Sequence, residues 1–179
     1  MNHLIVLPGN SLKNRTWGEV MVNHYGPRFD SVYMQSYEHW ERGAPVIDFD
    51  VELVKLRERT MPLFESPEVT VIAKSAGALL TFVAAAEGVL KPDKCIFFGI
   101  PFDLAAKGIF KDDWSAVENF KTPAITFHNY NDPTADYRFT MATLEQYAPH
   151  IQFVTTEGDD HWYGDTDTYD QHLQDFLPQ

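Results

Sequence analysis

Apolar runs of strand length alternate with helix-like segments along the whole chain. Continuous apolar runs, as opposed to alternating ones, are typical of strands that are covered on both faces, as in parallel sheets. Six runs bounded by polar or turn-forming residues predict such strands: His3–Leu7, Ser31–Gln35, Val69–Ala73, Lys94–Ile100, Ala124–His128 and Ile151–Thr155.

The intervening segments carry apolar residues at helical spacing. They predict helices over 17–25 with Thr16 as its cap, from Asp48 or Asp50 to before Pro67, over 76–87, from Pro133–Thr134 onward, and at the end with Tyr169, Leu173 and Phe176 on one face. Residues 36–45 are expected to form a loop. Residues 101–120 are expected to be mixed, with a short helix near Trp114.

Short connections between strand and helix segments predict a parallel α/β sheet with right-handed crossovers and helices on both faces, a three-layer αβα architecture. The sequence contains no internal repeat, low-complexity tract or linker, so residues 1–179 are expected to form one domain. In open sheets of this kind, functional residues lie outside the carboxyl ends of the strands. Six loops therefore hold the candidate chemistry.

Ser75 lies in one of these loops, in the sequence Ala-Lys-Ser-Ala-Gly between a predicted strand and a predicted helix. A nucleophile at the apex of such a tight turn adopts a positive φ, a strained value for a residue with a Cβ. The residues two before and two after must then be small, and Ala73 and Gly77 are. A serine that merely caps the helix is the simpler alternative.

Asp132 follows the fifth predicted strand, and His161 follows the sixth. Asp132 could be an ordinary turn former, and His161 an ordinary surface histidine. Their occurrence with Ser75 in the right loops and in the order Ser, Asp, His favours a catalytic triad instead. Asp103, after the fourth strand, is the alternative acid.

The chain is acidic, with 26 Asp and Glu against 14 Lys and Arg and a formal net charge of -12. Such a charge repels nucleic acids and anionic membranes, so both are excluded as expected partners. No apolar run approaches the roughly 20 residues of a membrane span. Cys95 is the single cysteine, which precludes an intramolecular disulfide and fits a reducing compartment. The protein is expected to be cytoplasmic.

The set Ser75, Asp132 and His161, with Pro8-Gly9-Asn10-Ser11 after the first strand, resembles the α/β-hydrolase superfamily. Within it, almost the whole chain is similar to the small, nearly lidless serine hydrolases of the retinoblastoma-binding-protein-nine type. The resemblance implies the strand order 2-1-3-4-5-6 and cleavage of small acyl esters through an acyl-enzyme. The chain departs from the family by Ala73 in place of glycine and by Pro8 where many members carry histidine.

The resemblance also implies an oxyanion hole formed by the N–H of Ala76 and that of Asn10 or Ser11. A small-molecule acyl substrate is the expected partner, and neither a metal nor an organic cofactor is expected. Lys74 is interpreted as a surface or packing residue. Aromatic residues near the carboxyl-end loops are expected to shape an apolar pocket, with core packing as the alternative for each: Trp40, Phe102, Phe110, Trp114, Trp162 and Tyr163.

Two other site types fit the sequence poorly. The acidic stretch that starts at Asp165 has Asp170 and Phe176 where a calcium loop needs glycine and glutamate. The residues around Gly9 match neither a dinucleotide-binding nor a P-loop pattern. The remaining alternative function is a catalytically silent α/β-hydrolase fold that acts as a binding or sensing module. The sequence leaves the oligomeric state open.

Overall fold

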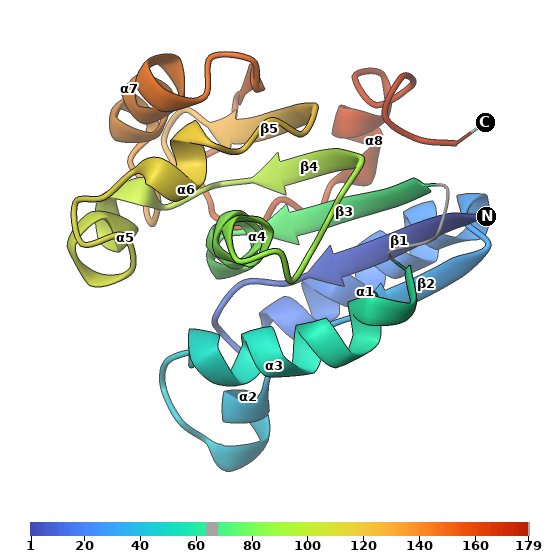
Figure 1. Cartoon of the computed structure of the whole chain (residues 1–179). Helices are drawn as coiled ribbons and strands as arrows, with labels where there is room; N and C mark the ends of the chain where they lie inside the picture. The colour runs from blue at the N-terminus through green and yellow to red at the C-terminus, as the bar shows by residue number, and fades with distance from the viewer. Residues whose placement is uncertain (64–67, 179) are drawn as a thin grey trace.

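Six parallel strands form one sheet in the computed structural model, which describes residues 1–63 and 68–178 (Figure 1). The strand order is β2-β1-β3-β4-β5-β6, which confirms the predicted architecture and order. The strands are β1 (Asn2–Leu7), β2 (Ser31–Met34), β3 (Glu68–Lys74), β4 (Lys94–Phe98), β5 (Ala124–Asn129) and β6 (Gln152–Thr156).

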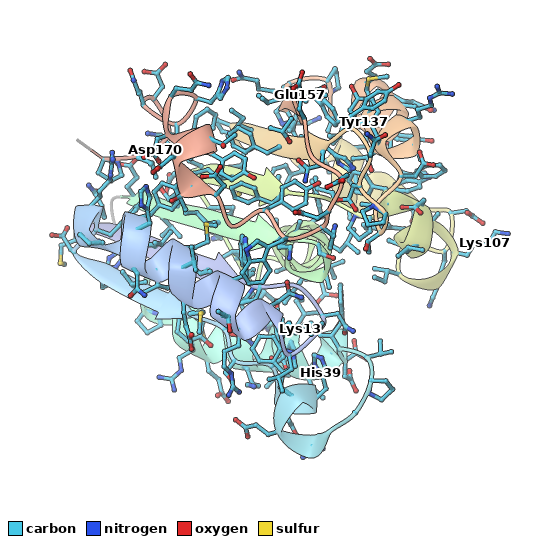
Figure 2. The ribbon with its side chains drawn as sticks, turned by 180° about the vertical axis from the view of Figure 1, so that it is seen from behind. Lys13, His39, Lys107, Tyr137, Glu157 and Asp170 are labelled. Carbon is cyan, nitrogen blue, oxygen red and sulfur yellow. The ribbon has the colours of Figure 1, made fainter. Side chains whose placement is uncertain are left out.

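Helices cover both faces of this sheet (Figures 1 and 2). One face carries α1 (Asn14–Tyr25) and α8 (Thr166–Asp170). The other carries α2 (Glu38–Arg42), α3 (Phe49–Thr60), α4 (Ala76–Ala86), α5 (Phe102–Gly108), α6 (Ser115–Glu118) and α7 (Tyr137–Tyr147).

Successive residues of β1 point into the two different cores, because side chains alternate across a strand. Leu4 and Val6 pack with the α1 residue Trp17, whereas Ile5 and Leu7 pack in the core on the α4 side. All four are at most 1% exposed. Burial on both faces is the physical reason for the continuous apolar runs in the sequence.

Two helix starts differ from prediction. Helix α1 begins at Asn14, and no side chain caps it, so Thr16 is not its cap. Helix α7 begins at Tyr137 and is capped by Asp136, whose side chain accepts a hydrogen bond from the Phe139 N–H, so it does not begin at Pro133–Thr134. The predicted Asp48 cap of α3 is confirmed, since its side chain accepts from the N–H groups of the first turn. Pro67, the predicted stop, lies outside the described residues.

Two segments have the wrong predicted structure. Residues 38–42, assigned to a loop, form α2, because Glu52 of α3 accepts a hydrogen bond from the Glu38 N–H at 2.6 Å and so holds the helix start. Conversely, the predicted last helix is too long: α8 ends at Asp170, and the buried Leu173 belongs to the turns that follow the helix. In the described part of the chain, no helix is long and apolar enough to cross a membrane.

Candidate active site

Ser75 occupies a strained turn between β3 and α4, with φ 53° and ψ −120°. Its N–H donates to the Phe98 carbonyl of the neighbouring strand β4 at 2.9 Å, which fixes the turn. The Ser75 side chain makes no capping hydrogen bond to α4. The helix-cap explanation therefore does not account for a serine at this position, and positive φ at a non-glycine residue is typical of functional sites.

Gly77 is required for this turn because α4 lies against the first loop. A Cβ at Gly77 would lie 2.0 Å from the Leu7 carbonyl oxygen and 2.5 Å from that of Pro8, both backbone atoms. The close approach brings the start of α4 to the loop that contains Asn10. The N–H groups of the first helical turn have no intrahelical acceptor, so the Ala76 N–H is free to bind another group.

Asp132 and His161 are joined by a short hydrogen bond. His161 Nδ1 lies 2.7 Å from Asp132 Oδ2, and the Asp132 side chain is fully buried. The other carboxylate oxygen of Asp132 accepts hydrogen bonds from the N–H groups of Thr134 and Ala135, at 2.8 and 3.0 Å. Asp132 therefore forms its local turn and holds His161 at the same time, one oxygen for each.

Tyr163 is a further partner of Asp132 that the sequence analysis did not identify in this role. Its hydroxyl donates to Asp132 Oδ2 at 2.6 Å and accepts from the Asn129 N–H at 2.9 Å. Burial, with the Asp132 hydrogen bond, raises the pKa of Tyr163 far above its usual range, so the phenol stays protonated. Burial alone would raise the pKa of Asp132, but hydrogen bonds from His161 and Tyr163 bring it below its ordinary value.

The alternative acid, Asp103, has a different contact. Its Oδ1 accepts from the Asp136 N–H at 3.3 Å, and no hydrogen bond links it to His161 in the described part of the molecule.

Gly99, directly after β4, makes room for the hydrogen-bonded side chains of Asp132 and His161. A Cβ there would lie 2.9 Å from His161 Cε1 and 3.0 Å from Asp132 Oδ2.

A pocket of about 430 Å³ contains both Ser75 and His161. His161 Nε2 is buried and has no hydrogen-bond partner among the described residues, Ser75 included. Besides these two, the polar residues Asn10, Ser11, Asn14 and Thr134 line the pocket. The rest of its wall is mainly aliphatic and includes one aromatic ring: Val46, Ile47, Phe49, Ala76, Leu79, Pro101, Leu104, Ala105 and Ile109.

The first loop is held by α2. The Asn10 carbonyl oxygen accepts hydrogen bonds from His39 Nε2 and Trp40 Nε1, both at 2.7 Å. Asn10 Oδ1 accepts from the Ile47 N–H at 2.7 Å, which places the apolar wall of the pocket beside the loop. The N–H groups of Asn10 and Ser11 make no hydrogen bond within the described part of the chain, so both are available to a ligand in the pocket.

None of the aromatic residues predicted to shape the pocket lines it. Trp40 supports the first loop, and Phe102 packs edge-on to Trp114, at 5.6 Å between ring centroids. Phe110 belongs to the same core, and Trp162 lies over Lys74. Trp40, Phe102, Phe110 and Trp114 pack in the core on the α4 side, so the wall of the pocket consists mainly of aliphatic side chains together with Phe49.

The described residues contain one group of side chains placed to hold a metal ion: His24, Asp167 and Asp170, on the face covered by α1 and α8. His24 already pairs with Asp170, at 3.0 Å between Nε2 and Oδ2. None of the three residues lines the Ser75 pocket. This group joins α1 to α8 and has no part in the candidate active site.

The chain has the α/β-hydrolase fold. Its sequence matches no family model and no curated protein. Among solved structures it is similar to a lidless α/β serine hydrolase from Xanthomonas campestris (TM-score 0.71, 17% identity, 99% of this chain and 83% of the other). An esterase from Pyrococcus furiosus gives a TM-score of 0.74 at 13% identity, over 99% and 82% of the two chains. Acyl-protein thioesterase 2 from Zea mays gives 0.65 at 12%, over 97% and 93%.

Proposed function

We propose that the protein is a serine hydrolase that cleaves small acyl esters through a triad of Ser75, His161 and Asp132. One observation carries the proposal: a positive-φ serine at the end of β3 shares a pocket with a histidine whose other nitrogen is bonded to a buried aspartate. The chain shares its fold with solved structures that are described as an esterase and a serine hydrolase, and this likeness supports the same class of enzyme.

In the proposed first step, Ser75 Oγ bonds to the acyl carbon and the carbonyl π electrons move to the oxygen. His161 Nε2 takes the hydroxyl proton. Nδ1 of this imidazole faces Asp132, so the tautomer with its proton on Nδ1 leaves the Nε2 lone pair free. The Asp132 carboxylate, stabilised by the Tyr163 hydroxyl, then favours the imidazolium that forms.

The negative oxygen would be bound by the Ala76 N–H and by an N–H of the first loop, from Asn10 or Ser11. Collapse of the tetrahedral intermediate breaks the bond to the alcohol, which leaves with the proton from His161. Water, which gives a proton to His161, then attacks the acyl-enzyme. The bond to Ser75 Oγ breaks, Ser75 takes the proton back from His161, and the acid is released. The aliphatic wall of the pocket favours a substrate with an apolar group next to its carbonyl.

The test is hydrolysis of p-nitrophenyl acetate together with labelling by a fluorophosphonate probe. Ser75→Ala is expected to lower kcat by about 10⁴-fold or more and to abolish labelling. Ser115→Ala, on the exposed surface of α6, is the matched control and should leave both unchanged. Retained turnover in Ser75→Ala would reject the assignment. A folded wild type that neither turns over esters nor reacts with the probe would favour the silent binding module.

The acid is tested separately by a pair of variants. Asp132→Asn is expected to lose most activity, because it removes the carboxylate that holds His161. Asp103→Asn should keep it, since the Asp103 contact at 3.3 Å is to the Asp136 N–H. The reverse result would transfer the acid role to Asp103.

A further inference from the structure

Lys74, the residue before Ser75, is buried although it carries a charge. Only 2% of it is exposed, and no carboxylate lies within ion-pair distance of it in the described residues. Its Nζ donates to Asn14 Oδ1 at 2.6 Å. A buried ammonium without a carboxylate partner is expensive, so packing alone does not explain a lysine here.

The Lys74 ammonium also lies over two indole rings. Nζ is 5.7 Å from the ring centroid of Trp17 and 5.4 Å from that of Trp162, within the range of cation–π attraction. Lys74, Asn14, Trp17 and Trp162 are called the lysine cluster below. Its members come from β3, α1 and the loop after β6, so it joins three separate segments around one charge.

This cluster contacts the loop that carries His161. Trp162 is the next residue along the chain, and Trp17 Nε1 donates to the Tyr163 carbonyl oxygen at 2.9 Å. The backbone on the carboxyl side of His161 is therefore held by two members of the lysine cluster. Tyr163, fixed in this way, presents its hydroxyl to Asp132.

We propose that Lys74 is a positioning residue of the hydrolase, whose ammonium holds the 161–163 loop so that His161 and Tyr163 keep their places around Asp132. The inference rests on the proposed function, since it assigns a role within that reaction. It differs from the sequence-based interpretation of Lys74 as a surface or packing residue. Lys74 acts through Trp162 and Tyr163 and touches no reacting atom.

The charge of Lys74 gives this role a pH dependence. Burial lowers the pKa of Lys74 to about 8, and Asp132 and Asp160 oppose that shift. Asn14, Trp17 and Trp162 are neutral. The other titratable groups that face His161 and Asp132 are Tyr163, whose phenol stays protonated, and the buried His128. The ammonium is thus present at pH 7 and lost above about pH 8.

Lys74→Met tests the proposal, since it removes the charge and keeps an apolar chain of similar length. We expect kcat/KM for p-nitrophenyl acetate to fall roughly 10- to 100-fold at pH 7, because a misplacement of about 1 Å costs up to about 10²-fold. The wild-type profile should decline above about pH 8 as Lys74 loses its proton, and the variant should lack this decline. Lys13→Met is the matched control: Lys13 is exposed at the start of α1 and precedes Asn14 (Figure 2).

A second readout needs no catalysis. Hydrogen exchange of the Trp17 indole N–H, which donates to the Tyr163 carbonyl oxygen, should be faster in Lys74→Met than in wild type, because the 161–163 loop is no longer held. An unchanged pH profile together with unchanged exchange of this N–H would overturn the role of Lys74. If Ser75→Ala abolishes hydrolysis while Lys74→Met has no effect, only this inference fails. If Ser75→Ala keeps activity, the proposed function fails.

A variant pair keeps the test decisive should Lys74→Met not fold. Trp162 is 40% exposed, so its replacement leaves the core intact. Trp162→Phe retains an aromatic face for the ammonium and should keep most activity, whereas Trp162→Leu removes the face and should lose activity at pH 7. Equal activity in both variants would contradict the proposal.

Discussion

Lys74→Met is expected to make the protein more stable at neutral pH, although under the proposed function it should lower hydrolytic activity. The folded state lowers the pKa of Lys74 from 10.5 to about 8 because the side chain is buried. Between these two values the unfolded chain binds more protons than the folded one. The free energy of unfolding of wild type therefore rises with pH across this interval, and below it the buried ammonium is a fixed cost.

The size of this cost follows from the two pKa values. At about 1.36 kcal/mol for each pKa unit, the fall from 10.5 to about 8 corresponds to about 3 kcal/mol below pH 7. Methionine removes this cost but leaves Asn14 Oδ1 without its donor, a loss of about 1–3 kcal/mol. The net gain at pH 6–7 is therefore at most about 2 kcal/mol, and each kcal/mol corresponds to roughly 2–4 °C in Tm in a chain of this size.

Urea unfolding of both proteins at several pH values measures the effect. From pH 7 to pH 10 the stability advantage of Lys74→Met should shrink by about 2–3 kcal/mol, as the wild-type lysine loses its proton in the folded state. The unpaired Asn14 oxygen is present only in the variant, but its cost does not depend on pH, and the tyrosines are the same in both proteins, so neither contributes to the trend. Lys13→Met should show no such trend. A difference that stays constant from pH 7 to 10 would refute the reasoning.

Two further predictions concern residues around the proposed triad. Gly77→Ala should destabilise the fold by about 3 kcal/mol or more in urea unfolding, because its Cβ meets backbone oxygen atoms at 2.0 and 2.5 Å. Gly108→Ala, with open space at its Cβ, is the control and should be neutral or slightly stabilising; equal effects would exclude the steric argument. Tyr163→Phe removes a hydrogen bond to the buried Asp132 carboxylate and should destabilise by about 1.5–3 kcal/mol above pH 5. Since that bond lowers the pKa of Asp132, the loss should diminish as acid protonates Asp132, and a pH-independent loss would contradict this.

The fold could be predicted because its signals are local. Each buried strand is a continuous apolar run, and the alternation with helices sets the parallel arrangement. Helix α2 was missed because its start is held by Glu52, a residue of another helix, and its own five residues give no periodic signal. The end of α8 was misplaced because Leu173 belongs to the turns after the helix but is buried and stands at helical spacing from Tyr169. Apolar periodicity alone does not distinguish such turns from a longer helix.

The candidate site could likewise be predicted only in part from the sequence. The small residues around Ser75 predicted its turn because the steric demand comes from neighbours in the sequence and from the adjacent strand. The prediction of an aromatic pocket was wrong because a sequence can indicate that a large ring is buried but not whether it lines a pocket or packs in the core. Tyr163 was missed as a partner of Asp132, since a tyrosine in a loop carries no sign of the acceptor that its hydroxyl meets.

Lys74 shows why polar residues are the hardest to interpret from sequence. A lysine beside a loop is taken as exposed, because an unpaired ammonium inside a protein is costly. Here Asn14, 60 positions earlier, and Trp162, 88 positions later, surround it. Neither residue singles out Lys74 in the sequence, and only the fold assembles them. A buried charge retained at such a cost, next to Ser75 and the loop that carries His161, is better explained by the proposed reaction than by the stability of the fold.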